Sequence, residues 1–250
     1  SVVKMLKNII MTAVRSDGNA IQFAPGEYKN DMEIIFVALD QNGAAFEHIS
    51  EEAQEDINVI KRAVDSCGTV LAELSEENRE DREIVLLAVM NDGMALEYAS
   101  EELREDPEIV LAAVNQNGLS LEFASEIIQN NEQIVLAAVN NDGLSLVHAG
   151  EDRREEKDIT MAAVQNKGAA VEYTSLELMQ DPDVMLAAVT QDGSSLQFIL
   201  QGLQAVVIED ECEENQEMFM EIVKSALHSD GSALQYLDLD DESTQRWLQL

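Results

Sequence analysis

Glycine returns at a fixed interval with the same neighbours around it, and this periodicity limits the possible folds of the chain more than any other feature. Eight glycines follow one another in steps of 25 residues, and a ninth comes after a longer gap: Gly18, Gly43, Gly68, Gly93, Gly118, Gly143, Gly168, Gly193 and Gly231. A fixed period of this size indicates a stack of similar supersecondary units. Stacked units bury their core between neighbours and leave long surfaces free for partners. We therefore expect one elongated repeat array.

The repeat around Gly118 opens with a strong helix start. Asp106 is a favoured N-cap residue, and Pro107 follows at the first helical position. Apolar residues then recur along one side of a helix, which predicts a first helix over about 107–117. Gly118 is expected to end this helix in the left-handed conformation that glycine adopts readily at the C′ position.

After the glycine, a second helix of about two turns is expected over 119–124. Ser125 is expected to cap a last turn over 126–128, which is short enough to favour a 3₁₀ geometry. The first cap recurs at Asp31, Asp56, Asp81, Asp106, Asn131, Glu156 and Asp181, and the second at Ser50, Ser75, Ser100, Ser125 and Ser175. The predicted fold class is all-α: a right-handed α-solenoid of nine repeats of about 25 residues each.

A single elongated domain over 1–250 is expected. Its units lie at about 6–31, 32–56, 57–81, 82–106, 107–131, 132–156, 157–181, 182–200 and 218–250, with an acidic insertion at 201–217. The first unit carries Pro25-Gly26-Glu27-Tyr28 in place of a serine-capped turn, so its connection is expected to be irregular. Trp247 and Leu248 are expected to seal the last core face as a terminal cap.

The insertion is the candidate partner-binding segment. Within nine residues it holds six acids: Glu209, Asp210, Glu211, Glu213, Glu214 and Glu217. Loops tolerate growth and often carry binding residues, which favours a functional role. A flexible connector is an equally plausible interpretation of the same segment.

Two further columns follow the period. An alanine stands five residues before each of the nine glycines, as at Ala113 and Ala138, and we interpret it as a close helix–helix crossing that a larger side chain would open. This predicts that Ala113→Leu destabilises the fold more than Gln116→Leu does. Five residues after each glycine runs a mostly aromatic column: Phe23, His48, Glu73, Tyr98, Phe123, His148, Tyr173, Phe198 and Tyr236. Stacking of bases or rings is one interpretation, and packing between repeats is the favoured one.

The charge balance restricts the partners. Fifteen Lys and Arg face fifty Asp and Glu, a net charge of −35. This balance opposes binding to nucleic acid or an anionic membrane, and it favours solubility or a basic partner. The longest apolar runs are far too short to cross a membrane. The chain starts at Ser1 without an initiator Met, as a fragment, a tag-cleaved chain or a processed organellar chain would, so the compartment stays open.

Residues for catalysis or metal binding do not converge in the sequence. His48 and His148 occupy equivalent positions four repeats apart, and neither Cys67 nor Cys212 has a histidine at ligand spacing. No phosphate-binding loop, nucleophile elbow or His-Glu-x-x-His motif occurs. The Asp-Gly pairs lack the alternating ligands of a calcium-binding EF-hand loop. We expect no enzyme, no cofactor and no metal site.

The pattern Asp106-Pro107-Glu108-Ile109-Val110, with Ala113-Val114, Asn117-Gly118 and Leu121-Glu122-Phe123-Ala124-Ser125, resembles the DUF4116 repeats, a domain family of unknown function. The resemblance extends from about Ile9 to Tyr236 and departs from the pattern at 25–28 and 201–217. It implies a tandem helical repeat array and no assigned activity. The repeat size also resembles that of leucine-rich variant repeats, which alternate α and 3₁₀ helices, as an architectural analogy.

The favoured functional hypothesis is a non-catalytic protein-binding or scaffolding solenoid, with a peripheral subunit of an organellar complex as one form of it. The first alternative is an acidic nucleic-acid mimic that occupies the binding groove of a basic protein. The second alternative is a weak calcium-binding acidic protein. The sequence leaves the oligomeric state and the binding face open.

Overall fold

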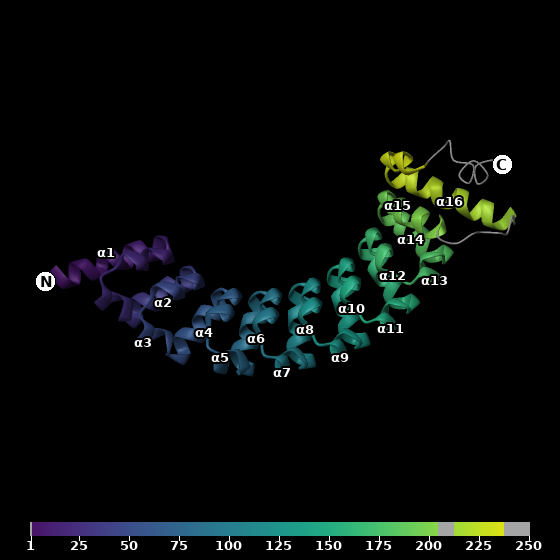
Figure 1. Cartoon of the computed structure of the whole chain (residues 1–250). Helices are drawn as coiled ribbons and strands as arrows, with labels where there is room; N and C mark the ends of the chain where they lie inside the picture. The colour runs from purple at the N-terminus through teal and green to yellow at the C-terminus, as the bar shows by residue number, and fades with distance from the viewer. Residues whose placement is uncertain (1, 205–212, 238–250) are drawn as a thin grey trace. The chain divides into compact units, whose positions relative to one another are not determined.

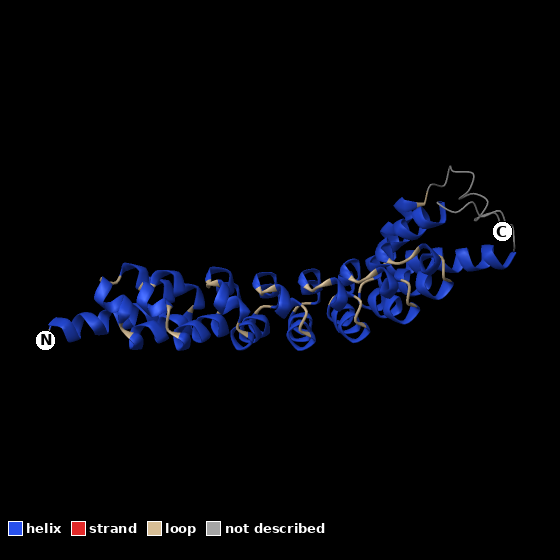
Figure 2. Ribbon diagram, turned by 60° about the horizontal axis from the view of Figure 1, so that its bottom comes forward, coloured by secondary structure: helices blue, strands red, loops and turns tan. Residues whose placement is uncertain are grey.

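The computed structural model describes residues 2–204 and 213–237, and the chain divides into two compact halves, residues 1–125 and 126–250. In the described residues all regular structure is helical, as the blue ribbons of Figure 2 show. The prediction of an all-α chain of tandem repeats is therefore confirmed. Its right-handedness and the count of nine repeats stay predictions.

The N-terminal half alternates α-helices with 3₁₀ helices, which are labelled η. In chain order it contains α1 (Val2–Ser16), η1 (Gly18–Phe23), η2 (Gly26–Asn30), α2 (Met32–Gln41), η3 (Gly43–His48), α3 (Glu51–Gln54), α4 (Ile57–Ser66), η4 (Gly68–Glu73), α5 (Glu76–Glu80), α6 (Arg82–Asn91), η5 (Gly93–Tyr98), α7 (Glu101–Arg104), α8 (Pro107–Gln116) and η6 (Gly118–Phe123). The expected first helix of the Gly118 repeat thus ends one residue earlier than predicted.

The C-terminal half continues the same alternation up to Gly193 and then departs from it. It contains α9 (Glu126–Gln129), α10 (Glu132–Asn141), η7 (Gly143–His148), α11 (Glu151–Arg154), α12 (Lys157–Asn166), η8 (Gly168–Tyr173), α13 (Leu176–Met179), α14 (Pro182–Gln191), η9 (Gly193–Ser195), α15 (Leu196–Gln204), α16 (Glu213–Ser229) and η10 (Gly231–Tyr236).

Within each half the ten-residue helices pack side by side. Figure 1 shows α2, α4, α6 and α8 in this arrangement, with the short helices α3, α5 and α7 along one edge, and contacts join each long helix to the next. In the other half α10, α12, α14 and α16 are joined in the same way. The core lies between successive helices, where residues such as Ile84, Val85, Ala88 and Val89 of α6 are fully buried.

Apart from the first repeat and the Gly193 repeat, the two short elements of a repeat have the opposite geometry to the predicted one. The segment after the glycine is a 3₁₀ helix, such as η5, and the serine-capped turn is a single α-helical turn, such as α7. The reason lies in the buried positions. In η5 Gly93, Ala95 and Leu96 are buried, and the spacing of three between Gly93 and Leu96 matches three residues per turn.

The glycines do not adopt the left-handed conformation that the sequence suggested. In the described residues no glycine has a positive φ. The long helix α8 ends instead at an extended Asn117, whose N–H donates to the Ala113 carbonyl over 2.8 Å. The Asn117 side chain then accepts from the N–H of Leu119 over 3.1 Å. The Asp-Gly and Asn-Gly pairs therefore mark the start of a 3₁₀ helix as well as the end of an α-helix.

Most predicted caps are confirmed. The first cap accepts a backbone hydrogen bond at Asp31, Asp56, Asp81, Asp106, Asn131 and Asp181. Glu156 makes no such bond, as expected of a side chain too long to fold back onto its own helix start. The second cap is formed by Ser50, Ser75, Ser100 and Ser175. The cap predicted at Ser125 is wrong, because its Oγ is buried without a hydrogen-bond partner.

The irregular places in the sequence are irregular in the structure. In the first repeat the serine-capped turn is replaced by the 3₁₀ helix η2, in which Tyr28 is buried. After Gly193 the 3₁₀ helix lasts three residues and passes into α15. The end of the expected insertion is not a loop, because α16 begins at Glu213. Trp247 and Leu248 lie outside the described residues.

Candidate functional site

Repeats meet through a close approach between a glycine and an alanine carbonyl. A Cβ placed on Gly93 would lie less than 3.0 Å from the carbonyl oxygen of Ala113 in the next repeat. The same clash would occur for the pairs Gly18–Ala38, Gly43–Ala63, Gly68–Ala88, Gly143–Ala163, Gly168–Ala188 and Gly193–Ala226. The last pair shows that the register resumes after the insertion. The close crossing inferred from the alanines is thus present at these seven pairs, and in each of them a glycine lies opposite the alanine.

At the same junction, a side-chain amide of the next repeat forms hydrogen bonds to the main chain beside the glycine. The N–H of Gly93 donates to Gln116 Oε1 over 2.7 Å, and Gln116 Nε2 donates to the Asn91 carbonyl over 3.2 Å. Asn91, Asn166 and Gln191 make the equivalent pairs of bonds. The role of these amides was not predicted from the sequence. Their recurrence two residues before the glycine was the signal that could have identified them.

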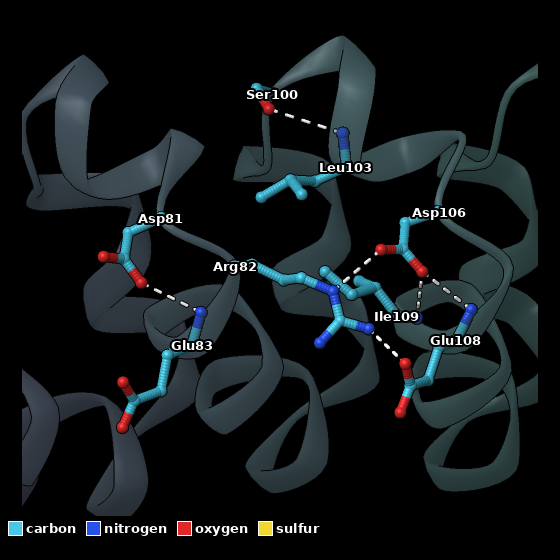
Figure 3. A network of polar contacts seen from close by, with 8 residues as sticks. All are labelled: Asp81, Arg82, Glu83, Ser100, Leu103, Asp106, Glu108 and Ile109. Atoms are coloured by element: carbon cyan, nitrogen blue, oxygen red, sulfur yellow. Dashed lines mark hydrogen bonds and ion pairs between the residues drawn. The ribbon is translucent and has the colours of Figure 1, made fainter.

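Figure 3 shows a polar bridge between α6 and α8. Arg82 Nε lies 2.9 Å from Asp106, and the guanidinium also pairs with Glu108. Partial burial raises the pKa of Asp106, but hydrogen bonds from Arg82 and from the N–H groups of Glu108 and Ile109 outweigh burial, so the pKa lies below its usual value. Lys7 and Lys157 bridge the next repeat in the same way, to Asp31 and Glu33 and to Asp181 and Asp183.

Two more basic residues of the N-terminal half pair with acids of a neighbouring repeat. Lys61 pairs with Glu83 over 2.7 Å, and Arg62 pairs with Asp40 while lying over the Phe36 ring, 5.6 Å from its centroid. The outer surface of α4 is therefore charged, whereas α2 contributes only Asp40 among the apolar Phe36 and Val37.

On the long helices α6, α8, α10, α12 and α14 the outer positions carry no charged residue. The residues at the third, sixth and seventh positions before each Asp-Gly or Asn-Gly glycine, or its equivalent, point away from the buried side of their helix. In the N-terminal half we define the neutral face by Leu86, Leu87 and Met90 of α6 and Leu111, Ala112 and Asn115 of α8. Met90 is 64% exposed and Leu111 is 38% exposed. In a chain with 26% charged residues, an uncharged and partly apolar surface is unusual.

The C-terminal half has a neutral face of its own at the same positions. It consists of Leu136, Ala137 and Asn140 of α10, Met161, Ala162 and Gln165 of α12, and Leu186, Ala187 and Thr190 of α14. The apolar members are half-buried and the polar members are exposed. Neither neutral face was predicted from the sequence, although no charged residue stands at these three positions in five successive repeats.

The predicted partner-binding residues are only partly described. Glu209, Asp210 and Glu211 lie outside the described residues, whereas Glu213 and Glu214 begin α16 and Glu217 is exposed on it. In the mostly aromatic column most side chains are half-buried, which agrees with packing at the edge of the repeats. Two members depart from this: Phe23 is 82% exposed, and Glu73 is exposed.

Two findings concern other kinds of site. Among residues 2–204 and 213–237, no three His, Cys, Asp or Glu side chains are grouped so that they could hold a metal ion. None of the described helices combines the length and the apolar character that a membrane span requires.

Comparisons with known proteins agree with the repeat geometry. Neither a curated protein nor a solved structure matches the chain. The family described as "Domain of unknown function (DUF4116)" matches at residues 7–52, 56–104, 106–154 and 156–204. Each match spans two of the recurring glycines, so one family domain corresponds to two repeats. Because the matches cover most of its length, the chain belongs to the DUF4116 family.

Proposed function

We propose that the chain is a non-catalytic protein-binding or scaffolding module, built as one elongated right-handed α-solenoid. The observation that carries the proposal is the pair of neutral faces, one on α6 and α8 and the other on α10, α12 and α14. Exposed apolar patches bordered by polar residues are typical of protein–protein contact surfaces. Leu and Met side chains held half-exposed on rigid helices need little ordering when a partner binds.

The contrast between neighbouring helices supports this assignment. On α4 the equivalent positions are Lys61, Arg62 and Asp65, which a solvated surface would explain. On α6 they are Leu86, Leu87 and Met90. If these positions faced only water, they would be expected to carry charges as the nearby short helices do. Burial against a partner explains the absence of charge, because burying an unpaired charge is costly.

The proposal can be tested with a photo-crosslinking residue at position 90, which would identify the partner that contacts the neutral face. The affinity of the purified partner is then measured for Met90→Glu/Leu111→Glu and for a control, Phe23→Glu. Phe23 is apolar and exposed in the same half but lies off the neutral face. We expect the double variant to weaken binding at least about tenfold and the control to bind as the wild type does. Equal affinities for all three chains would contradict the proposal.

A second candidate, the acidic mimic of nucleic acid, is favoured by one observation. The short helices carry pairs of exposed glutamates at successive repeats: Glu51 and Glu52, Glu76 and Glu77, and Glu101 and Glu102. A basic groove that binds such rows would release them as salt is added, so its affinity would fall steeply in a salt titration. Binding that depends on Met90 and barely changes with salt would favour the neutral face.

A further inference from the structure

The neutral face of the C-terminal half carries its largest apolar side chains in one row. Leu136, Met161 and Leu186 stand at the same position of α10, α12 and α14, and each is half-buried. These three helices lie side by side, because contacts join each of them to the next (Figure 1). Helices packed in this way lie about 8–10 Å apart. The row therefore presents one large apolar side chain at each helix interval.

This interval matches a partner segment that is helical and not extended. In an α-helix, residues seven positions apart lie on one side and are separated by about 10 Å along the axis. In a β-strand, residues on one side follow at about 7 Å and then at about 13 Å, and neither distance fits the interval. An apolar residue at every seventh position is therefore the pattern expected in a segment that crosses α10, α12 and α14.

Acidic residues border the row at the starts of the same helices. Each helix has one exposed acid three or four positions before its large apolar residue, and so about one turn away on the same side: Glu132, Asp158 and Asp183. Lys157 is the one basic residue in the first turns of these helices, and it already pairs with Asp181 and Asp183. Within the described residues Glu132 and Asp158 form no ion pair. The border is therefore acidic and largely uncompensated.

The next helix of the stack limits this surface. On α16 the positions equivalent to the neutral face are Lys224, Ser225 and His228. The Ser225 hydroxyl lies 3.0 Å from that of Thr190, so α16 continues the surface directly, but with a charged residue on it. The surface that is both neutral and bordered by acids thus covers α10, α12 and α14. About fifteen residues of a helix, at 1.5 Å per residue, cross it.

The charge of the whole chain restricts what can cover this face. With a net charge of −35, a second copy of the chain is repelled, and so is an anionic membrane. A basic segment is attracted, because opposite charges steer surfaces together and select the partner. The apolar row supplies the contact area that charge alone does not give.

We propose that the neutral face of the C-terminal half binds a basic amphipathic helix of a partner protein, laid across α10, α12 and α14. Apolar residues of this helix at intervals of seven would contact Leu136, Met161 and Leu186. Its Lys or Arg residues would pair with the acids at the starts of the three helices. This inference rests on the proposed protein-binding function and adds the chemistry of the partner.

The test uses three designed peptides of about 18 residues as probes of the 250-residue chain. The first carries leucine at two positions of each heptad and lysine on the opposite side, so that it forms a basic amphipathic helix. The second contains the same residues in an order that scatters the leucines around the helix. The third has glutamate in place of every lysine. Fluorescence anisotropy of the labelled peptides measures each affinity.

We expect the first peptide to bind at least about tenfold more tightly than either of the others. Met161→Glu should weaken its binding by a similar factor, because it places a charge in the middle of the apolar row. Asp158→Lys should weaken the lysine peptide and strengthen the glutamate peptide, because it reverses the charge of the border. Asp152→Lys is the matched control: it makes the same change at an exposed acid of α11, in the same half but off the neutral face. It should change both affinities less than Asp158→Lys does.

Circular dichroism confirms that the variants fold, and the comparison of the three peptides on the wild-type chain needs no variant. Equal affinities for the lysine peptide and its scrambled form would overturn the inference, because charge alone would then drive binding. Binding that Met161→Glu leaves unchanged would place the contact elsewhere. An effect of Asp158→Lys no larger than that of Asp152→Lys would remove the acidic border from the site.

The failure of this inference can be distinguished from the failure of the proposed function. If the peptides fail these tests while a partner crosslinked at position 90 still depends on Met90, the protein-binding function stands and the basic amphipathic helix is excluded as its partner.

Discussion

The carbonyl oxygen of Ala113 lies so close to the Cα of Gly93 that a methyl group on the glycine would come within 3.0 Å of it. Both residues are fully packed between α6 and α8, and the same relationship recurs at every described junction within each half. The recurring glycine therefore allows the main chains of two successive repeats to approach each other closely at the same place in each repeat. It fixes which face of one repeat meets which face of the next.

The first prediction follows from this contact. Gly93→Ala should destabilise the fold by about 1–3 kcal/mol, because the added methyl group meets a main-chain atom that cannot rotate away. Gly26→Ala is the matched control in the same half, since nothing lies within 4 Å of its Cβ position, and it should be neutral or slightly stabilising. Chemical unfolding of both variants measures the difference. Equal effects would show that the junction can open without cost.

A second prediction concerns the amide that holds the same junction. Gln116→Leu should cost about 1–3 kcal/mol, because the buried N–H of Gly93 and the Asn91 carbonyl lose their partner. Gln116→Asn should retain most of the stability, since Asn91 and Asn166 fill the equivalent role elsewhere. Denaturation midpoints of the two variants test this. A loss of the same size in both would assign the effect to shape and not to hydrogen bonding.

This hydrogen bond also changes one comparison suggested by the sequence. From the sequence, Ala113→Leu is predicted to destabilise more than Gln116→Leu, because only the alanine is expected to face a neighbouring helix. Because Gln116 bonds two groups of the preceding repeat, both substitutions should be destabilising. The fully buried Ala113 still predicts a large loss for its leucine variant.

The third prediction concerns the bridge between Arg82 and Asp106. Asp106 has a lowered pKa in the folded state, so its charge contributes stability above the unfolded pKa, near 3.8, that is lost as the pH falls through the folded pKa. Asp106→Asn keeps a good N-cap but removes the charge. The wild-type chain should therefore be more stable than this variant at pH 7, and the gap should close below pH 3.8.

Comparing variants is necessary because fifty acidic residues titrate together. Arg82→Gln supplies the control: in that background Asp106→Asn should have a smaller effect at pH 7, and a double-mutant cycle isolates the interaction between the two side chains. An unchanged effect would mean that the backbone hydrogen bonds alone lower the pKa of Asp106.

Much of the fold could be predicted from the sequence because local signals repeat. Asp106 and Pro107 mark a helix start that α8 confirms, and nine copies of one pattern leave little doubt about the repeat. The role of Gly93 could not be read from the sequence in the same way. A glycine after a helix usually signals a left-handed residue, and only the stacking of repeats reveals that the absence of a side chain matters. The choice between 3₁₀ and α geometry at η5 and α7 likewise depends on packing.

The neutral faces were harder to predict for a different reason. The identity of a residue such as Leu86 does not show whether its side chain faces the core, a neighbouring repeat or a partner. Only the structure separates Leu86 from the fully buried Ile84 and Val85 of the same helix. The acidic segment at 201–217 is conspicuous in the sequence because it interrupts the 25-residue period. The neutral faces lie on the regular repeats, where no interruption marks them.

The fourth prediction concerns Glu73, the one acid in the mostly aromatic column. Partial burial, followed by repulsion from Glu47, raises the pKa of Glu73 despite the attraction of His48. An acid whose pKa is raised on folding weakens the folded state once the pH exceeds its unfolded value, near 4.5. Glu73→Gln should therefore raise the thermal midpoint at pH 7 and leave it unchanged below pH 4.5. The same gain at both pH values would indicate that the improvement comes from packing and not from the removed charge.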